Sequence, residues 1–166
     1  LAFAIAAPGT VRALVLDGAP DLDPGATHGD IPLAHYRTVF QTQGIEAFRL
    51  LWQQHPHMQL RTRDSATRAL LHAMLQRYDG RDLLDVSCDA TPATTRMALE
   101  SIRAPALVLN GELDLDSRSA AADYLCRQLP VCERALIINA GHLANLDNPA
   151  DYAAAIQDFF TRHLPG

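Results

Sequence analysis

The pattern of apolar and polar positions separates the two ends of the chain from its middle. Near both ends there are short runs with continuously apolar centres, at Val11–Leu16, Ala104–Asn110 and Arg134–Asn139. Runs of this kind are typical of strands that are covered on both faces, as in a parallel sheet. Between the first and second runs, residues 33–100 carry apolar side chains at helical spacing and contain no convincing strand. Strands that alternate with helices predict an α/β fold with a parallel sheet.

Local signals indicate where helices begin and end in the two outer parts. A helix covering Leu1–Ala7 should stop at Pro8-Gly9. Ser117 is expected to cap a helix that runs to about Leu129, because serine is a favoured N-cap residue. Asn148-Pro149 should start the last helix, since proline suits the first helical position. The inward face of that helix is expected to carry Tyr152, Ile156, Phe159 and Phe160.

The helical middle contains three predicted segments. The first has an apolar face made of Ile45, Phe48 and Trp52. The second begins at Asp64-Ser65, a typical N-cap signal, and Thr91-Pro92 opens the third. The apolar face of the second segment comprises Leu70, Leu71, Met74, Leu75 and Tyr78. Because an insertion of about 80 residues is too long for an ordinary connection, the sequence predicts a core of residues 1–20 and 101–166 with a helical cap of residues 21–100.

Composition narrows the class of protein. The chain has 166 residues, of which 48% are hydrophobic and 20% charged, as in a soluble globular protein. The net charge is −5 and the basic residues do not cluster, which argues against a nucleic-acid partner. No apolar run approaches the length of a membrane span. Three cysteines, Cys88, Cys126 and Cys132, are an odd number without metal-site spacing, which favours reduced thiols in a cytoplasmic protein.

Two short motifs follow successive predicted strands near the end of the chain. Gly111-Glu-Leu-Asp114 comes after the second strand, and Ala140-Gly-His-Leu143 comes after the third. An aspartate and a histidine at the carboxyl ends of neighbouring parallel strands are suited to act as orienting acid and general base. We expect Asp114 to bind the imidazole of His142. Other carboxylates could take this place, namely Glu112 and Asp116 in the same loop and Asp17 at the end of the first strand.

No serine of the chain matches the sequence in which a hydrolase nucleophile is usually presented. In α/β-hydrolases the nucleophile stands in Gly-x-Ser-x-Gly and precedes the acid and the base in the chain. None of the serines here has a glycine two positions before it and another two after it; they are Ser65, Ser87, Ser101, Ser117 and Ser119. The acid and the base are therefore present without a recognisable nucleophile.

With these motifs the chain resembles the C-terminal portion of a cap-bearing α/β-hydrolase of the esterase, lactonase and peptidase type. The segment Ile102–Gly111 followed by Asp114 is similar to the acid strand of that family, and Gly141-His142-Leu followed by Asp147-Asn-Pro149 is similar to its histidine loop. The resemblance implies a hydrolase of esters, lactones or related acyl compounds that needs no cofactor. It also implies that the nucleophilic serine lies shortly before Leu1 and that the cap closes over a small-molecule substrate.

Two alternatives remain open at this stage. Epoxide hydrolases and haloalkane dehalogenases of the same fold use an aspartate nucleophile, and their acid and histidine would look the same. The chain could also be a non-catalytic fragment that binds another chain. Since Val11–Leu16 would have an unpaired edge, we further expect the N-terminal part of the enzyme as a companion chain or missing segment, or else self-association.

The remaining candidates are weaker. Trp52, Phe48 and Met74 could line a substrate pocket beneath the cap, although their spacing also suits the cap's own core. The segment His55-Pro-His57 lacks a third metal ligand nearby and is interpreted as a solvated loop between cap helices. Four further histidines are expected at the surface, at positions His28, His35, His72 and His163.

Overall fold

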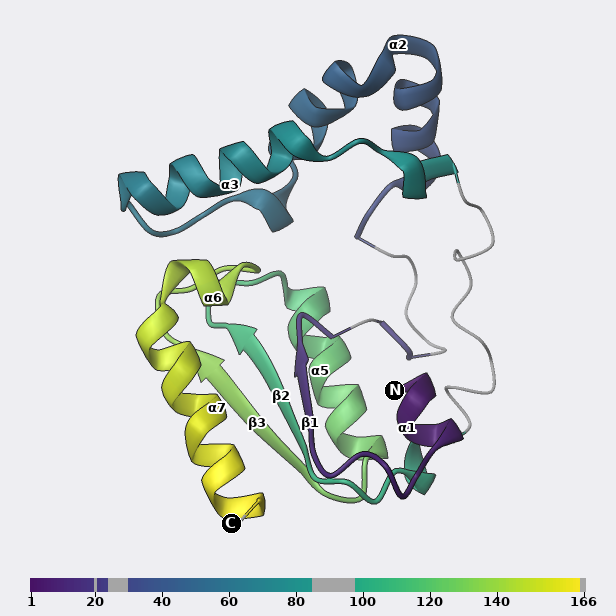
Figure 1. Cartoon of the computed structure of the whole chain (residues 1–166), viewed down its shortest axis with the longest axis vertical. Coiled ribbons are helices and arrows are strands. Elements are labelled where there is room, and N and C mark those ends of the chain that lie inside the picture. The colour runs from purple at the N-terminus through teal and green to yellow at the C-terminus, as the bar shows by residue number, and fades with distance from the viewer. Residues whose placement is uncertain (20, 24–29, 85–97, 165–166) are drawn as a thin grey trace.

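A three-stranded parallel sheet forms the centre of the structure, a computed structural model that describes residues 1–19, 21–23, 30–84 and 98–164. The strands are β1 (Leu14–Asp17), β2 (Ala106–Gly111) and β3 (Cys132–Ile137), in the order β1-β2-β3 (Figure 1). Leu14 stands opposite Ala106, which in turn stands opposite Cys132. This arrangement confirms the predicted α/β architecture with a parallel sheet.

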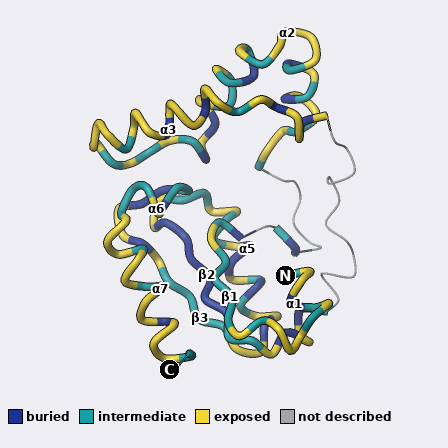
Figure 2. The backbone as a smooth tube through the Cα atoms, in the orientation of Figure 1, coloured by how far each residue is buried: buried dark blue, intermediate teal, exposed yellow. Residues whose placement is uncertain are grey.

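Helices cover both faces of the sheet, which explains why β2 reads as a continuous apolar run. All six residues of β2 are buried (Figure 2). Successive side chains of a strand point to opposite faces of the sheet. Ala106 and Val108 belong to a core with α1 (Ala2–Ala6) and α5 (Asp116–Gln128). Leu107 and Leu109 belong to a second core with α6 (Ala144–Asp147) and α7 (Pro149–His163).

The helices between β1 and β2 form a separate layer, which we call the helical insert (residues 30–84). It contains α2 (Leu33–Gln53), the short η1 (Pro56–Met58), α3 (Ser65–Arg77) and η2 (Arg81–Leu84). The insert has a small core of its own around Tyr36, Phe48 and Leu83. Figure 1 shows this layer above the end of the sheet toward which the arrowheads of β2 and β3 point. The insert therefore faces the carboxyl ends of the strands.

Several predicted boundaries are shifted or wrong. β1 begins at Leu14 rather than Val11, and β3 begins at Cys132, two residues before the expected start. Ser117 does not cap α5: the helix starts at Asp116, and the hydroxyl of Ser117 donates to the carboxylate of Asp30 instead.

The caps of two other helices are confirmed, since Asp64 accepts from the N–H of Thr67 and Asn148 accepts from the N–H of Asp151. The helix expected at Thr91-Pro92 lies outside the described residues, whereas η4 (Leu99–Ser101) is described just before β2.

The apolar faces of two helices are narrower than expected. In α3, Leu71 and Leu75 are buried while Leu70 and Met74 are both half exposed. In α7, Phe159 is fully buried but the exposed fraction of Phe160 is 37%. Each helix contacts the rest of the protein along one side only, so adjacent apolar residues in its sequence cannot all face inward.

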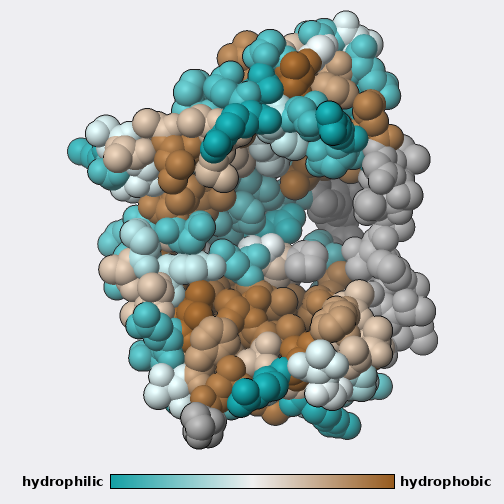
Figure 3. All heavy atoms as spheres, in the orientation of Figure 1, coloured by the Kyte–Doolittle hydropathy of each residue, from teal (hydrophilic) through white to brown (hydrophobic). Residues whose placement is uncertain are grey.

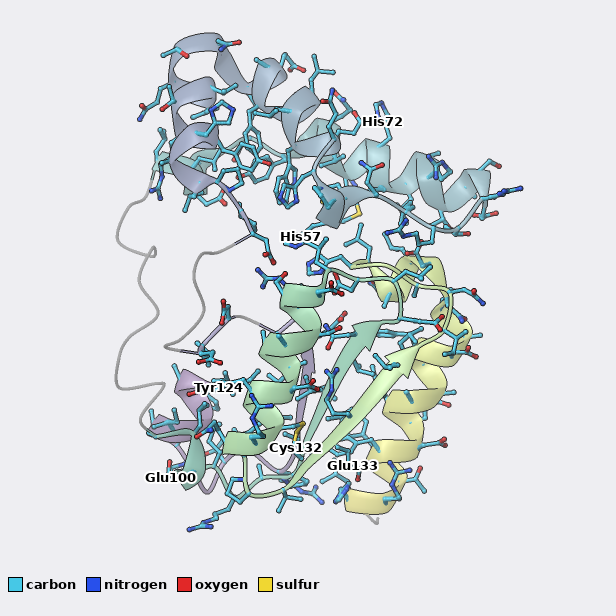
Figure 4. The ribbon with its side chains drawn as sticks, turned by 180° about the vertical axis from the view of Figure 1, so that it is seen from behind. His57, His72, Glu100, Tyr124, Cys132 and Glu133 are labelled. Atoms are coloured by element: carbon cyan, nitrogen blue, oxygen red, sulfur yellow. A yellow bond between two sulfur atoms is a disulfide. The ribbon has the colours of Figure 1, made fainter. Side chains whose placement is uncertain are left out.

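The prediction of reduced thiols is wrong for two of the three cysteines. Cys126 near the end of α5 and Cys132 at the start of β3 form a disulfide, with 5.2 Å between their Cα atoms (Figure 4 labels Cys132). The connection between helix and strand folds back sharply, which brings these two positions within disulfide reach. Cys88 lies outside the described residues.

Candidate catalytic site

The acid and the histidine singled out in the sequence meet at the carboxyl ends of β2 and β3. Asp114 lies in the turn after β2, and His142 lies in the loop after β3. The imidazole Nδ1 of His142 is 3.1 Å from Oδ2 and 3.2 Å from Oδ1 of Asp114. The expected contact is therefore present. A carboxylate in this position fixes which imidazole nitrogen carries the proton and leaves Nε2 free for another partner.

Asp114 is held as a buried carboxylate. Its side chain is 1% exposed, and it accepts a hydrogen bond from the N–H of Leu115 at 2.8 Å. The side-chain amide of Asn110 approaches Oδ2 at 3.4 Å. Burial would raise the pKa of the Asp114 carboxyl, but the hydrogen bonds from His142 and from Leu115 outweigh it and hold the pKa below its usual range. The carboxylate is consequently ionised at neutral pH and can stabilise a charged imidazole.

The other carboxylates have different partners. Asp17, at the end of β1, accepts from the hydroxyl of Tyr152 at 3.1 Å, and burial raises its pKa. Glu112 accepts from the N–H of Asn139. Asp116 is the first residue of α5. The geometry therefore favours Asp114 as the partner of His142.

Two glycines allow the acid turn and the histidine loop to come together. A Cβ on Gly111 would lie 2.1 Å from the carbonyl oxygen of Gly141 and 2.3 Å from that of Ala140. A Cβ on Gly18, whose φ is +57°, would lie 2.9 Å from Cε1 of His142 and 3.4 Å from its Nε2. A side chain at Gly111 would displace the histidine loop, and one at Gly18 would push the His142 ring aside, so both positions need glycine. The imidazole thus lies against the end of β1, with its Cε1 nearest to Gly18.

A second histidine, His57, lies directly on His142. Their ring centroids are 3.9 Å apart and the rings are 21° from parallel. The interpretation of His55-Pro-His57 as a solvated loop is wrong, because His55 and His57 are only 8% and 2% exposed. Figure 4 shows His57 between the helical insert and the core. The sequence signals a turn here through Pro56, but no sequence pattern indicates that the turn packs on a loop 85 residues later.

Comparison with solved structures identifies the fold. The chain matches no protein-family model and no curated protein sequence. Among solved structures, it is similar to MenH from S. aureus, with 19% identity over 97% of this chain and a TM-score of 0.77. An esterase from Thermogutta terrifontis shows 18% identity over 98% of this chain and a TM-score of 0.70. Est816, described as an N-acyl homoserine lactone degrading enzyme, shows 23% identity over 95% and a TM-score of 0.64.

The chain has the α/β-hydrolase fold. It spans 63% of the length of MenH, 60% of the esterase and 61% of Est816. In this fold the catalytic groups follow in chain order as nucleophile, acid and base. Asp114 and His142 have the order and the strand-end positions of the second and third of these groups.

A carboxylate in the histidine loop connects the α/β-hydrolase core to the helical insert. Asp147 accepts through Oδ2 from the N–H of Gly141 at 2.8 Å. Its Oδ1 accepts from the N–H groups of Arg61 at 2.7 Å and Thr62 at 2.9 Å. The residue that orients the turn before His142 therefore also holds the insert. No sequence pattern indicates this contact with the insert, which joins residues 85 or more apart.

The predicted pocket residues do not gather around the acid and histidine. A cavity of about 170 Å³ lies beside Asp114 and His142 and is also lined by Gln54, Gln59 and Arg61. Phe48 and Trp52 line a different cavity, of about 250 Å³, within the insert. Met74 is half exposed on α3 and lines neither of these two cavities. The structure thus places polar side chains of the insert next to the histidine.

Other sequence expectations concern metals, membranes and surface histidines. Within the described residues, no group of three or more His, Cys, Asp or Glu side chains could hold a metal ion. No helix among them has the length and apolar character needed to cross a membrane. His35 and His72 are exposed as expected, while His163 is partly buried against Glu133. His28 lies outside the described residues.

Proposed function

We propose that the protein is a hydrolase of esters, lactones or related acyl compounds in which Asp114 orients His142 as general base. The observation that carries this proposal is the contact between the His142 imidazole and the buried Asp114 carboxylate. Two structural neighbours support the substrate class, since one is described as an esterase and one as a lactone-degrading enzyme. No cofactor takes part in the proposed reaction.

The proposed mechanism needs a nucleophile on the Nε2 side of His142. A serine hydroxyl would give its proton to Nε2 as it attacks the acyl carbonyl, and the imidazolium would then return that proton to the leaving group. Because Asp114 binds Nδ1 and the ring lies against Gly18 at the end of β1, we place the serine near this residue, within reach of Nε2. Backbone N–H groups near the serine would stabilise the oxyanion.

In this proposal the serine comes from the part of the fold that precedes β1. None of the serines in this chain has the flanking glycines of a nucleophile elbow. β1 is an edge strand of the described sheet, and its residues Leu14, Val15 and Leu16 are only half buried. Figure 3 shows apolar side chains gathered over the sheet layer. An earlier segment of the same protein or a companion chain would pair with β1 and cover this surface.

The helical insert would act as a cap over the substrate. The cavity beside His142 contains polar groups of the insert, including Gln54, Gln59 and Arg61. Trp52, Phe48 and Met74 stay candidates for contacts with a larger acyl group. If they serve in this way, substituting Trp52 or Met74 changes kcat/KM unevenly across acyl chain lengths, by about 1–3 kcal/mol per lost contact. A uniform loss that follows a lower melting temperature would mean that they only stabilise the cap.

Hydrolysis of p-nitrophenyl butyrate by the whole protein tests the proposal. We expect His142→Ala to abolish most turnover. Asp114→Asn should lower kcat by about 10⁴, the loss known for the equivalent change in serine proteases, because the imidazole then adopts the wrong tautomer. His72→Ala, an exposed residue of α3, is the matched control. Nearly unchanged rates for both site variants would refute the assignment.

Two further measurements address the nucleophile. A fluorophosphonate probe should label the whole protein on a serine. Absence of labelling, together with turnover of an epoxide or a haloalkane, would instead indicate an aspartate nucleophile.

The 166-residue chain alone should not hydrolyse the ester and should self-associate in solution, since its β1 edge is unpaired. A stable monomer of this chain with His142-dependent turnover would contradict the location proposed for the nucleophile.

A further inference from the structure

We propose that His57 is a positioning residue for His142: it holds the imidazole in the plane of its contact with Asp114 and stabilises the imidazolium through its aromatic face. This inference rests on the proposed function of His142 as a base. It adds a group from the helical insert to a site whose acid and base both come from the core.

The two imidazole rings are stacked at short range. Their centroids are 3.9 Å apart and their planes differ by 21°. On its own side, His142 is fixed by Asp114 at Nδ1, while Gly18 lies against its edge. The ring of His57 occupies one face of the imidazole. Rotation of His142 away from Asp114 would therefore require the removal of His57.

The insert holds His57 rigidly in this position. Its side chain is 3% exposed, and its backbone N–H donates to Nδ1 of His55 at 3.2 Å. The ring of His55 stacks on Trp52 with 4.8 Å between centroids, and its Nε2 lies 3.1 Å from the carbonyl oxygen of Asp30. A ring supported in this way cannot easily swing out of contact.

The charges around His57 keep it neutral. The groups that face it are His55 of its own segment, Asp30 before α2, Arg118 of α5 and His142. Oδ2 of Asp30 is 3.6 Å from Nε2 of His57, but this oxygen already accepts from Arg118 at 2.6 Å and from the hydroxyl of Ser117 at 2.8 Å. The Asp30 charge is thus compensated by Arg118.

The remaining effects all disfavour a proton on His57. Burial, followed by the proximity of His142, His55 and Arg118, lowers the pKa of His57 to about 4, and the opposing effect of Asp30 is smaller. Nε2 of His57 is buried and has no hydrogen-bond partner among the described residues. At neutral pH the ring is consequently an uncharged aromatic surface.

A neutral aromatic ring lying flat on His142 can stabilise the charged imidazole that forms during the reaction. An imidazolium is attracted to the electron-rich face of a neighbouring ring, and this attraction is stronger when water is excluded. The stack should therefore stabilise the imidazolium that exists between proton uptake from the nucleophile and proton return to the leaving group.

The NMR signal of the His142 Cε1 proton in the whole protein tests this inference, because a ring stacked at 3.9 Å shifts this signal through its ring current. His57→Phe keeps a flat aromatic ring without a titratable nitrogen, whereas His57→Leu keeps an apolar side chain without an aromatic face. We expect the chemical shift of this proton to stay near the wild-type value in the Phe variant and to change clearly in the Leu variant, which has no ring current. His72→Leu, at an exposed position, is the control. If His57→Leu does not fold, His57→Gln provides the variant without an aromatic ring.

The kinetics of ester hydrolysis are the second readout. In the Leu variant, kcat should fall more than KM changes, while the Phe variant should restore kcat to near the wild-type value. An unchanged His142 signal in a folded Leu or Gln variant would overturn the inference. The NMR comparison needs no turnover, so it decides the role of His57 even if the protein fails to hydrolyse esters, which would refute the proposed function separately.

Discussion

Gly111→Ala is expected to separate the acid turn from the histidine loop. Gly111 is the last residue of β2 and begins the turn that carries Asp114. The added Cβ would lie 2.1 Å from the carbonyl oxygen of Gly141, whereas real Cβ contacts are almost never shorter than 3.0 Å. The loop before His142 must therefore move by about 1 Å, because the nearest atoms belong to backbone and cannot rotate away.

The size of the effect follows from two opposing contributions. Forcing extra volume into a well-packed site costs about 1–3 kcal/mol, and contacts to backbone place this case near the upper limit. Alanine is favoured over glycine in a strand by about 0.5–1 kcal/mol, and Gly111 does not have a positive φ that would oppose it. The net loss is about 2 kcal/mol, which corresponds to a fall in Tm of about 4–8 °C for a protein of this size.

Thermal unfolding followed by circular dichroism measures this loss. Gly9→Ala is the matched control, since a Cβ at Gly9 meets no atom within 4 Å and the change there should stay within about 0.5 kcal/mol. The NMR signal of His142 should shift in the Gly111 variant and stay in place in the control. If Gly111→Ala melts with the control and leaves that signal unchanged, the close approach of the two loops is not what positions His142.

Three further changes probe the same site. Gly18→Ala should push the His142 ring out of place and lower kcat by about 10²-fold. Because Gly18 has a positive φ, an alanine at this position should also lower the free energy of unfolding by about 1 kcal/mol, as measured by thermal unfolding. Asp147→Asn should cost about 1–3 kcal/mol in urea unfolding because one backbone N–H loses its acceptor, whereas Asp158→Asn, exposed on α7, should cost little. Because the pKa of Asp114 is lowered in the folded state, its carboxylate stabilises the fold above about pH 4. The loss of unfolding free energy in Asp114→Asn should therefore be greatest at neutral pH and should shrink as the pH falls through the folded-state pKa of Asp114.

The parts of the fold that depend on local sequence could be predicted. The apolar run in β2 indicated a strand buried on both faces, and all six of its residues are buried. Asn148 before Pro149 indicated the start of α7, because the cap is formed within four residues. The approach of Asp114 to His142 also followed, since carboxyl ends of adjacent parallel strands lie at one edge of a sheet.

The parts that depend on contacts between distant segments could not be predicted. Ser117 resembles an N-cap, but Asp30 of the insert binds its hydroxyl. The disulfide joins cysteines only six residues apart, but it depends on the sharp return of the chain from α5 to β3, which the number and spacing of the cysteines did not indicate. The sequence predicts that His57 lies in a solvated loop between cap helices, yet its ring is buried and stacks on that of His142.

These distant contacts also determine how the site is assembled. The helical insert contacts the core through Asp30, which pairs with Arg118. It also contacts the core through Arg61, whose backbone N–H donates to Asp147 and whose guanidinium donates to the carbonyl oxygen of Leu113. His57 lies between Asp30 and Arg61 along the chain and is stacked on His142. Asp147 uses its second oxygen to hold the turn before His142. Moving the insert would therefore break the hydrogen bonds of Asp147 to Arg61 and Thr62 and uncover the face of the His142 ring that His57 covers. Because Asp147 contacts both the insert and the turn before His142, the position of the insert and the position of the base are coupled.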